Sequence, residues 1–253
     1  MRAAFVKEYG AAASALVYSK TVAKPKITTT DGVLVRVRSA VLSSLDIEVR
    51  RGEWTYLMDQ TTSAHNAAAP HITGYEFAGI VEEVGSSVSS VSVGDEVCGL
   101  CSLTSRNGAC AEYTVQSEHA LVVKPKLVLH DDAAMAIGPG IFGLTALHYN
   151  LKVERGTSIL ICDAASPEGY VLIQLAAELG LRIFATARSQ AQVSFLEVLG
   201  DTVARIIDEV QENLADVIME ETNRMGVDYI VETLRYTPTL PSSTAESTTV
   251  PKN

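Results

Sequence analysis

Hydrophobic residues in the first half of the chain recur at the spacing of β-strands. Val33, Val35 and Val37 alternate with their neighbours, which is the two-residue period of a strand. Further short segments of this kind, bounded by glycines or turns, cover residues 79–85, 93–97 and 111–115. Short strands joined by glycine turns predict a barrel or a folded sheet. We therefore expect a β-rich domain over residues 1–128.

The second half of the chain alternates between short apolar runs and helical periodicity. The apolar runs cover residues 158–162, 182–187, 204–207 and 229–232. Segments with the 3.6-residue period of a helix cover residues 169–179, 189–199 and 210–223. Strands that alternate with helices predict a parallel, doubly wound sheet. We expect this α/β domain to span residues 129–235, with a helix over residues 138–149 near its start.

The final segment, residues 236–253, has a different composition. Residues 237–253 contain eight serines or threonines and three prolines, and they carry almost no apolar surface. Such a segment cannot offset the entropy lost on ordering, so we expect a disordered tail.

The charge of the chain argues against two classes of partner. The formal net charge is −10 and the pI is about 5.0, and no run of Lys or Arg interrupts this balance. An acidic surface repels phosphate backbones and anionic membranes, so we expect neither nucleic acid nor a membrane surface as a partner.

Two features oppose a secretory signal or a membrane span. Charged residues return within the first eight positions, too early for the apolar part of a signal peptide. The longest uncharged stretch, residues 133–151, is interrupted by Pro139 and three glycines. We expect a soluble, cytoplasmic protein.

The four cysteines do not form a convincing metal motif. Two residues separate Cys98 from Cys101 in a Cys-x-x-Cys pattern, and Cys110 follows, but no fourth ligand stands at a regular spacing. A disulfide framework is unusual in a chain of this length with no secretory signal. We expect free structural thiols and no metal.

The segment after the run 158–162 is the first candidate for ligand binding. In a doubly wound sheet the ligand lies at the carboxyl ends of the strands, where a helix N-terminus can face a pyrophosphate. This position holds residues 163–169, and the expected cofactor contacts are Ala165, Ser166 and Gly169. With one glycine and two acidic residues, the loop on its own is a weak nucleotide signal.

The residues after the second apolar run bear on which nucleotide would bind. An acidic residue here would hold the ribose hydroxyls of NAD, but the sequence has Arg188 and Ser189. A cation at this position favours a 2′-phosphate and therefore NADPH. Arg188 as an ordinary exposed cation at a strand end is an equally supported reading, and both stay open.

Several segments resemble the medium-chain dehydrogenase/reductase family. The similar segments are residues 74–81, 84–85, 93–97, 143–146 and 173–176, within a match that runs from residue 1 to about 233. The resemblance implies a GroES-like domain followed by a Rossmann domain. It also implies hydride transfer from NADPH to a small-molecule quinone or activated enone.

The same resemblance indicates the zinc-free quinone oxidoreductase branch. Zinc-dependent members carry a cysteine in the first domain and a His-Glu pair after a glycine. Ser43, Tyr75 and Glu76 stand at the corresponding positions here. Serine and tyrosine are poor zinc ligands, because the metal prefers thiolate, imidazole and carboxylate.

Family position also implies the catalytic residues. Ser43, Asp46 and Tyr56 would border the substrate, and Thr145 would lie near the nicotinamide and contact the cofactor. Two of these residues have structural alternatives. Asp46 can cap a helix over residues 47–50, and Thr145 can bond back along its own helix.

The chain departs from the family at the loop and at its end. Family members show Ala-Ala-Gly-Gly-Val-Gly where residues 164–169 read Ala-Ala-Ser-Pro-Glu-Gly. Beyond residue 233 the family continues through two more strands, the last of which forms the usual homodimer interface. We therefore expect an incomplete, C-terminally truncated Rossmann domain. Two functional hypotheses follow: an NADPH-dependent quinone or enone reductase, and a catalytically silent relative that acts as a binding or regulatory module.

Overall fold

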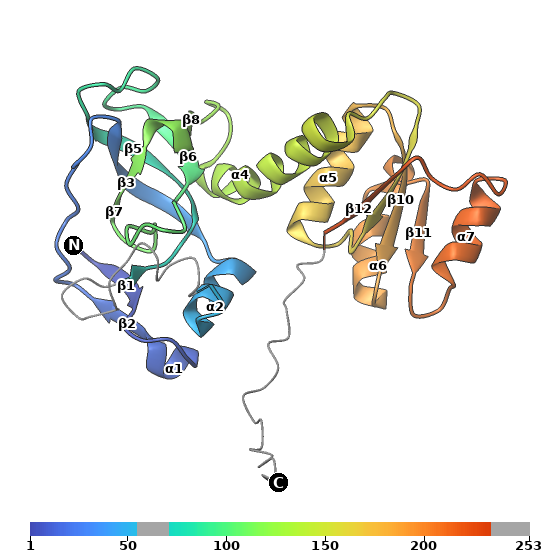
Figure 1. Ribbon diagram of the computed structural model, residues 1–253, viewed down its shortest axis with the longest axis horizontal. Helices are drawn as coiled ribbons and strands as arrows, with labels where there is room; N and C mark the ends of the chain where they lie inside the picture. The colour runs from blue at the N-terminus through green and yellow to red at the C-terminus, as the bar shows by residue number, and fades with distance from the viewer. Residues whose placement is uncertain (55–70, 234–253) are drawn as a thin grey trace, which may run out of the picture. The chain divides into compact units, whose positions relative to one another are not determined.

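The computed structural model describes residues 1–54 and 71–233 (Figure 1). The chain divides into two compact units, Met1–Thr145 and Ala146–Asn253. The division falls at the end of the helix that follows residue 128, the expected limit of the β-rich domain.

The first unit is built around a five-stranded antiparallel sheet in the order β7-β3-β5-β6-β8. Its core forms where the alternating apolar side chains of two long strands meet, with Val33, Val35, Phe77 and Val81 almost completely buried. The strands are β3 (Gly32–Val41), β5 (Glu76–Val84), β6 (Glu96–Leu100), β7 (Tyr113–Ser117) and β8 (Leu121–Val123). The predicted β-rich domain is confirmed.

A second, three-stranded sheet in the same unit has the order β2-β1-β4. Its strands are β1 (Ala3–Val6), β2 (Leu16–Ser19) and β4 (His71–Ile72), and the short helices of the unit are α1 (Ala12–Ala15), α2 (Ser44–Arg51) and the 3-10 turn η1 (Glu118–Ala120). These strands have two to four residues each, too few for a recognisable hydrophobic period.

One long helix, α4 (His130–Leu144), packs against the five-stranded sheet. Its small residues Ala133 and Ala134 are buried against Ala78 and Cys98. A π-helical turn, η2 (Thr145–Leu151), continues the chain. The helix therefore begins before the expected position, residue 138. Within the described residues, no helix combines the length and the apolar character needed to cross a membrane.

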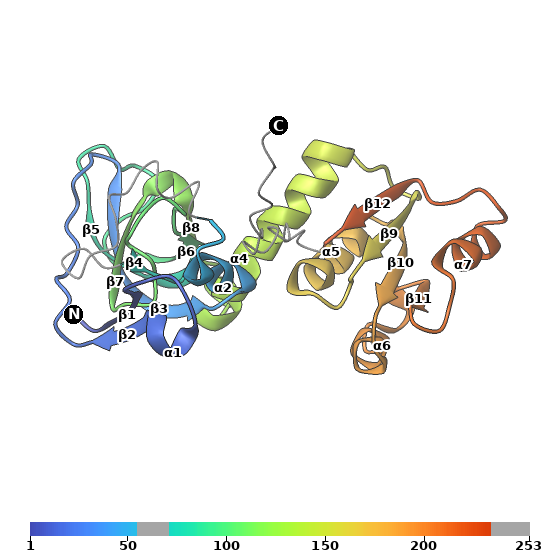
Figure 2. The same ribbon diagram turned by 60° about the horizontal axis from the view of Figure 1, so that its bottom comes forward.

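The second unit is a parallel sheet in the order β11-β10-β9-β12, covered by helices (Figure 2). Its elements are β9 (Ser158–Cys162), α5 (Pro167–Glu178), β10 (Arg182–Ala187), α6 (Gln190–Glu197), the 3-10 turn η3 (Gly200–Thr202), β11 (Arg205–Asp208), α7 (Leu214–Glu221) and β12 (Tyr229–Glu232). Parallel strands that alternate with helices confirm the predicted α/β sheet.

The strands of this sheet are apolar throughout because both faces are covered. Leu160 and Phe184 pack with Ile218 of α7, while Ile159 and Ile161 point to the opposite face and are fully buried. Helices α5 and α6 lie on the side of the sheet away from α7 (Figures 1 and 2). In the described residues, β12 pairs with β9 alone and forms one edge of the sheet.

Candidate functional site

The strand order places a ligand-binding position between β9 and β12. The chain runs outward from β9 to β10 and β11 and then returns to the other side of β9, so the connections diverge at this point. Ligands of such sheets bind outside the carboxyl ends of the strands where the direction reverses. The loop 163–169, predicted as a cofactor contact, occupies this position.

The loop is tied to the end of β12 by one residue. The Thr233 hydroxyl lies 2.7 Å from the carbonyl oxygen of Cys162 and 3.1 Å from that of Asp163. It also lies 3.0 Å from the hydroxyl oxygen of Ser166. The loop is further anchored to β10, because the Asp163 amide donates to the Thr186 hydroxyl at 3.0 Å. These bonds hold the loop on both neighbouring strands.

Ser166 caps the helix that faces this position. Its side chain accepts a hydrogen bond from the Gly169 amide at 3.0 Å, and Pro167 at the first turn has no amide hydrogen. Free amides at a helix N-terminus are the groups that bind phosphate. The first turn of α5 therefore offers a pyrophosphate fewer donors than an uncapped glycine-rich loop would.

Gly169 serves the packing of α5 on β9. A Cβ added there would lie 2.7 Å from the Ala164 Cα and 2.8 Å from the Asp163 carbonyl oxygen. This contact is the close helix–strand approach for which dinucleotide folds use the last glycine of their fingerprint. Asp163 itself adopts a φ of +51°, a left-handed conformation that most side chains avoid.

Arg188 and Ser189 follow β10 at the same edge of the sheet. Ser189 caps α6, since its hydroxyl oxygen accepts from the Gln192 amide at 3.3 Å. The Arg188 amide donates to the Gln192 side chain at 2.7 Å, and its Nε lies 2.9 Å from Oε2 of Glu209. The guanidinium is exposed, as both readings of Arg188 require, but it already has an acidic partner.

The carboxyl edge of the sheet is rich in acids. Burial, together with the carboxylates of Glu232 and Glu209, raises the pKa of the Cys162 thiol to about 11. The hydrogen bond with Glu209 also raises the pKa of Arg188, with smaller contributions from Asp163 and Glu232. An anionic ligand at this edge would meet the Arg188 guanidinium among the carboxylates of Asp163, Glu209 and Glu232.

In the first unit, Ser43 and Asp46 are joined at the start of α2. Oδ2 of Asp46 accepts from the Ser43 amide at 2.9 Å and lies 3.3 Å from its hydroxyl oxygen. Oδ1 accepts from the Gly74 amide at 2.7 Å, and the Asp46 side chain is buried. The expectation that Asp46 caps a helix over residues 47–50 was wrong, because α2 begins at Ser44 with Ser43 as its N-cap, and Asp46 lies in the first turn and bonds back to the cap. Asp46 links the start of α2 to the turn before β5.

That turn depends on a glycine. Gly74 has a φ of +89°, and a Cβ there would lie 2.8 Å from the Cys110 amide nitrogen. The next residue, Tyr75, is buried, and its hydroxyl oxygen lies 3.0 Å from Nε2 of the buried His71. Burial raises the pKa of the Tyr75 hydroxyl, so it stays protonated at neutral pH.

The cysteines of this unit are free thiols. Burial raises the pKa of Cys101 to about 12 and also raises the pKa values of Cys98 and Cys110. A protonated thiol is a poor metal ligand. In the part of the chain that the structure describes, no three His, Cys, Asp or Glu side chains are placed to hold a metal ion.

Two catalytic candidates remain. Thr145 is exposed at the end of α4, where the helix widens into η2. Single π-helical turns occur frequently at functional sites. Among the residues described, its hydroxyl makes no hydrogen bond back along the helix. Tyr56 and the predicted tail, residues 236–253, lie outside the described residues.

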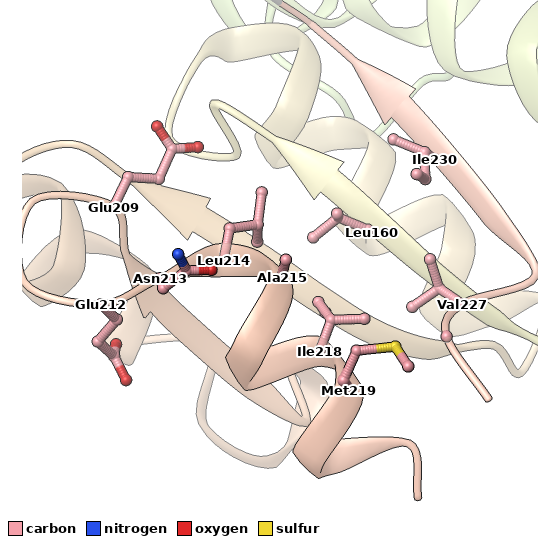
Figure 3. A pocket seen from close by; sticks show the side chains of 11 residues that line it. Leu160, Glu209, Glu212, Asn213, Leu214, Ala215, Ile218, Met219, Val227 and Ile230 are labelled. Atoms are coloured by element: carbon pink, nitrogen blue, oxygen red, sulfur yellow. The ribbon is translucent and has the colours of Figure 1, made fainter. Parts of the chain in front are cut away.

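An apolar groove of about 890 Å³ opens elsewhere on the second unit, between α7 and the sheet (Figure 3). Leu160, Leu214, Ile218, Val227 and Ile230 line it, with Glu209 and Glu212 at one end. None of the predicted site residues lines this groove. Its lining includes neither the loop 163–169 nor Arg188, although the lining residue Glu209 bonds to Arg188.

Sequence reasoning missed three residues of the nucleotide position: Gln192, Glu209 and Thr233. Gln192 was detectable, because a side chain three residues after a serine N-cap is a common partner of that cap. Glu209 bonds to Arg188, which is 21 residues away in the sequence. Thr233 bonds to Asp163, which is 70 residues away. No local pattern signals such pairs.

Comparison with known proteins agrees with this architecture. Residues 29–126 match the family model of the alcohol dehydrogenase GroES-like domain. Quinone oxidoreductase-like protein 1 of Mus musculus is 38% identical over 161 residues, covering 63% of this chain and 46% of that protein. The chloroplastic NADPH-dependent alkenal/one oxidoreductase of Arabidopsis thaliana is 32% identical over 195 residues, covering 74% of this chain and 47% of that protein.

Solved structures support the same relationship across both units. The quinone oxidoreductase of Pseudomonas syringae pv. Tomato DC3000 superposes with a TM-score of 0.74 and 26% sequence identity, covering 90% of this chain and 65% of that one. The chain thus spans about half the length of the curated relatives described above. Residues 29–126 thus belong to the alcohol dehydrogenase GroES-like domain family, and the parallel sheet and these similarities are consistent with the quinone oxidoreductase branch of the medium-chain dehydrogenase/reductases.

Proposed function

We propose that this chain acts in the cytoplasm as a zinc-free oxidoreductase that uses NADPH to reduce a small-molecule quinone or enone. The observation that carries the proposal is the end of β10, where Arg188 and the Ser189 hydroxyl stand beside the N-terminus of α6 with no acid in the turn itself. A 2′-phosphate is favoured by such a cation, hydroxyl and helix N-terminus together. The relatives named for NADPH and for quinones add support by similarity.

Each part of the dinucleotide has a proposed holder in the second unit. The N-terminus of α5, with Ala165, Ser166 and Gly169, faces the pyrophosphate, and Arg188 with Ser189 faces the 2′-phosphate. These residues fit the adenosine end better than the pyrophosphate, since Ser166 already uses the Gly169 amide. When bound, the nicotinamide would supply hydride.

In the first unit we assign the substrate-facing roles by family position. The Ser43 hydroxyl is the proposed donor to the substrate oxygen, and Tyr56 and Thr145 are the proposed neighbours of substrate and nicotinamide. Asp46 is a positioning residue, because both its oxygens already hold Ser43 and Gly74. No metal is needed, because a hydroxyl or water can stabilise the developing negative charge on an enone oxygen.

The test is NADPH oxidation, followed by absorbance at 340 nm, with a panel of quinones and α,β-unsaturated ketones. The proposal expects turnover that survives chelators and falls in Ser43→Ala. Turnover that requires added zinc, or none with any acceptor despite NADPH binding, contradicts it.

A second candidate function is a catalytically silent binding or regulatory module. The specific observation in its favour is the self-capped loop, in which Ser166 occupies the helix N-terminus and Asp163 and Glu168 add negative charge. A folded chain that binds neither NADPH nor NADH would favour this candidate.

A further inference from the structure

Glu209 is fixed beside the end of β10 by the backbone. It follows β11, which pairs in parallel with β10 so that Asp208 lies opposite Ala187. The Glu209 amide donates to the Ala187 carbonyl oxygen at 2.9 Å. This bond places Glu209 next to Arg188, although the two are far apart in the sequence.

The two side chains form a hydrogen-bonded ion pair. Nε of Arg188 lies 2.9 Å from Oε2 of Glu209, and the side chains are 47% and 24% exposed. The bond uses the inner nitrogen of the guanidinium. The two terminal nitrogens, which point away from the side-chain stem, remain available as donors in the part of the chain described.

Glu209 also lines one end of the apolar groove, where Figure 3 shows it together with Glu212. Its acidic neighbour Glu212 has a different partner, since it bonds to Arg205 and to the Asp208 amide. The two acids of the same turn therefore serve different cations.

We propose that Glu209 sets the cofactor preference of this chain, by holding Arg188 in place while opposing a 2′-phosphate through its negative charge. The inference rests on the proposed function, because it assigns a specificity role within the same nucleotide site. Arg188 alone would favour a 2′-phosphate strongly. With Glu209 in contact, the pair carries little net charge, and the preference for the phosphorylated cofactor is reduced.

The size of this effect follows from Coulomb's law. A phosphate held by the outer nitrogens of Arg188 would lie one guanidinium width from the Glu209 carboxylate. For a partly exposed pair of charges at such a distance, removing the carboxylate should tighten binding of the 2′-phosphate about tenfold at low salt. Because the pair is accessible to solvent, the gain should shrink as ionic strength rises.

The experiment measures a difference between two probes on the full chain. Adenosine 2′,5′-bisphosphate and 5′-AMP differ only by the 2′-phosphate, and their Kd values are measured by calorimetry for the wild type and for Glu209→Gln. Glutamine keeps the hydrogen bond to Nε of Arg188 and removes the charge. Glu212→Gln is the matched control, because it removes the same charge from the same turn but away from Arg188.

In Glu209→Gln the Kd of the bisphosphate should fall about tenfold, while the Kd of 5′-AMP is unchanged. Glu212→Gln should leave the ratio of the two Kd values unchanged. If both probes still bind to Glu209→Gln but the affinity for the bisphosphate relative to 5′-AMP is unchanged or lower, the inference is overturned and the proposed function stands. A wild-type chain that binds neither probe contradicts both.

Discussion

Replacing Gly169 by alanine tests whether this glycine is required by packing or by a bound phosphate. The added Cβ would lie 2.7 Å from the Ala164 Cα and 2.8 Å from two carbonyl oxygens, those of Ala164 and Asp163. All three atoms belong to the backbone, which cannot rotate away as a flexible side chain can. The first turn of α5 must therefore move from β9.

The expected loss of stability combines two opposing effects. Overpacking of this kind costs about 1–3 kcal/mol, and alanine regains up to about 1 kcal/mol over glycine in a helix. The net destabilisation of the second unit should be about 1–2 kcal/mol, or roughly 4–8 °C in Tm for each kcal/mol in a domain of this size. This loss is expected with no cofactor present.

Hydrogen exchange followed by mass spectrometry is the suitable assay, because it reads the two units separately. The amides of β9 and β10 should exchange faster in Gly169→Ala by the factor that corresponds to this free energy. Gly140→Ala is the control, since nothing lies within 4 Å of a Cβ at Gly140 in α4. The control should stabilise the first unit by about 0.5–1 kcal/mol. Unchanged exchange in β9 and β10 of Gly169→Ala would refute the packing role.

Three further changes have defined outcomes. Lys124→Met removes a buried ammonium that lies 2.9 Å from Glu96 and also holds two carbonyl oxygens, so urea denaturation should show a loss of about 2–4 kcal/mol. Asp163→Gly gives the φ of +51° to a residue without a Cβ and removes a carboxylate beside the phosphate position, so ADP should bind several-fold more tightly by calorimetry. The amides of Ser89 and Ser90 and the Ser90 hydroxyl hold the pKa of Glu118 below the ordinary 4.5. A carboxyl group whose pKa is lower in the folded chain than in the unfolded chain stabilises the fold at pH values above the unfolded pKa. This stabilisation is lost as the pH falls through the folded pKa, so Glu118→Gln should lose less folding stability than the wild type below pH 4.5.

Strands of the second unit were predictable because burial on both faces leaves a short, continuous apolar run. The bounds expected for β9, β10 and β12 are those that the structure has. Helix α7 was expected over residues 210–223 but begins at Leu214, because residues 210–212 form a turn whose amides bond to Asp208 at the end of β11. The side chain of Asn213 accepts from the Asp216 amide at 3.1 Å, and this cap is a signal that the sequence carried.

The candidate site was predictable only as far as local position determines it. The loop 163–169 and Arg188 lie at the carboxyl edge because each directly follows a strand. The acidic partner of Arg188 was not predictable, since it depends on which strand pairs with β10. The hold of Thr233 on the loop likewise needs β12 to return beside β9.

We propose that the carboxyl edge of this parallel sheet binds a 2′-phosphorylated dinucleotide. Fluorescence titration of the full chain with NADPH, with NADH as the control, measures this binding. We expect saturable binding of NADPH that is tighter than that of NADH and is weakened in Arg188→Ala. A folded chain that binds neither nucleotide, or one that binds both equally with no effect of Arg188→Ala, would contradict it.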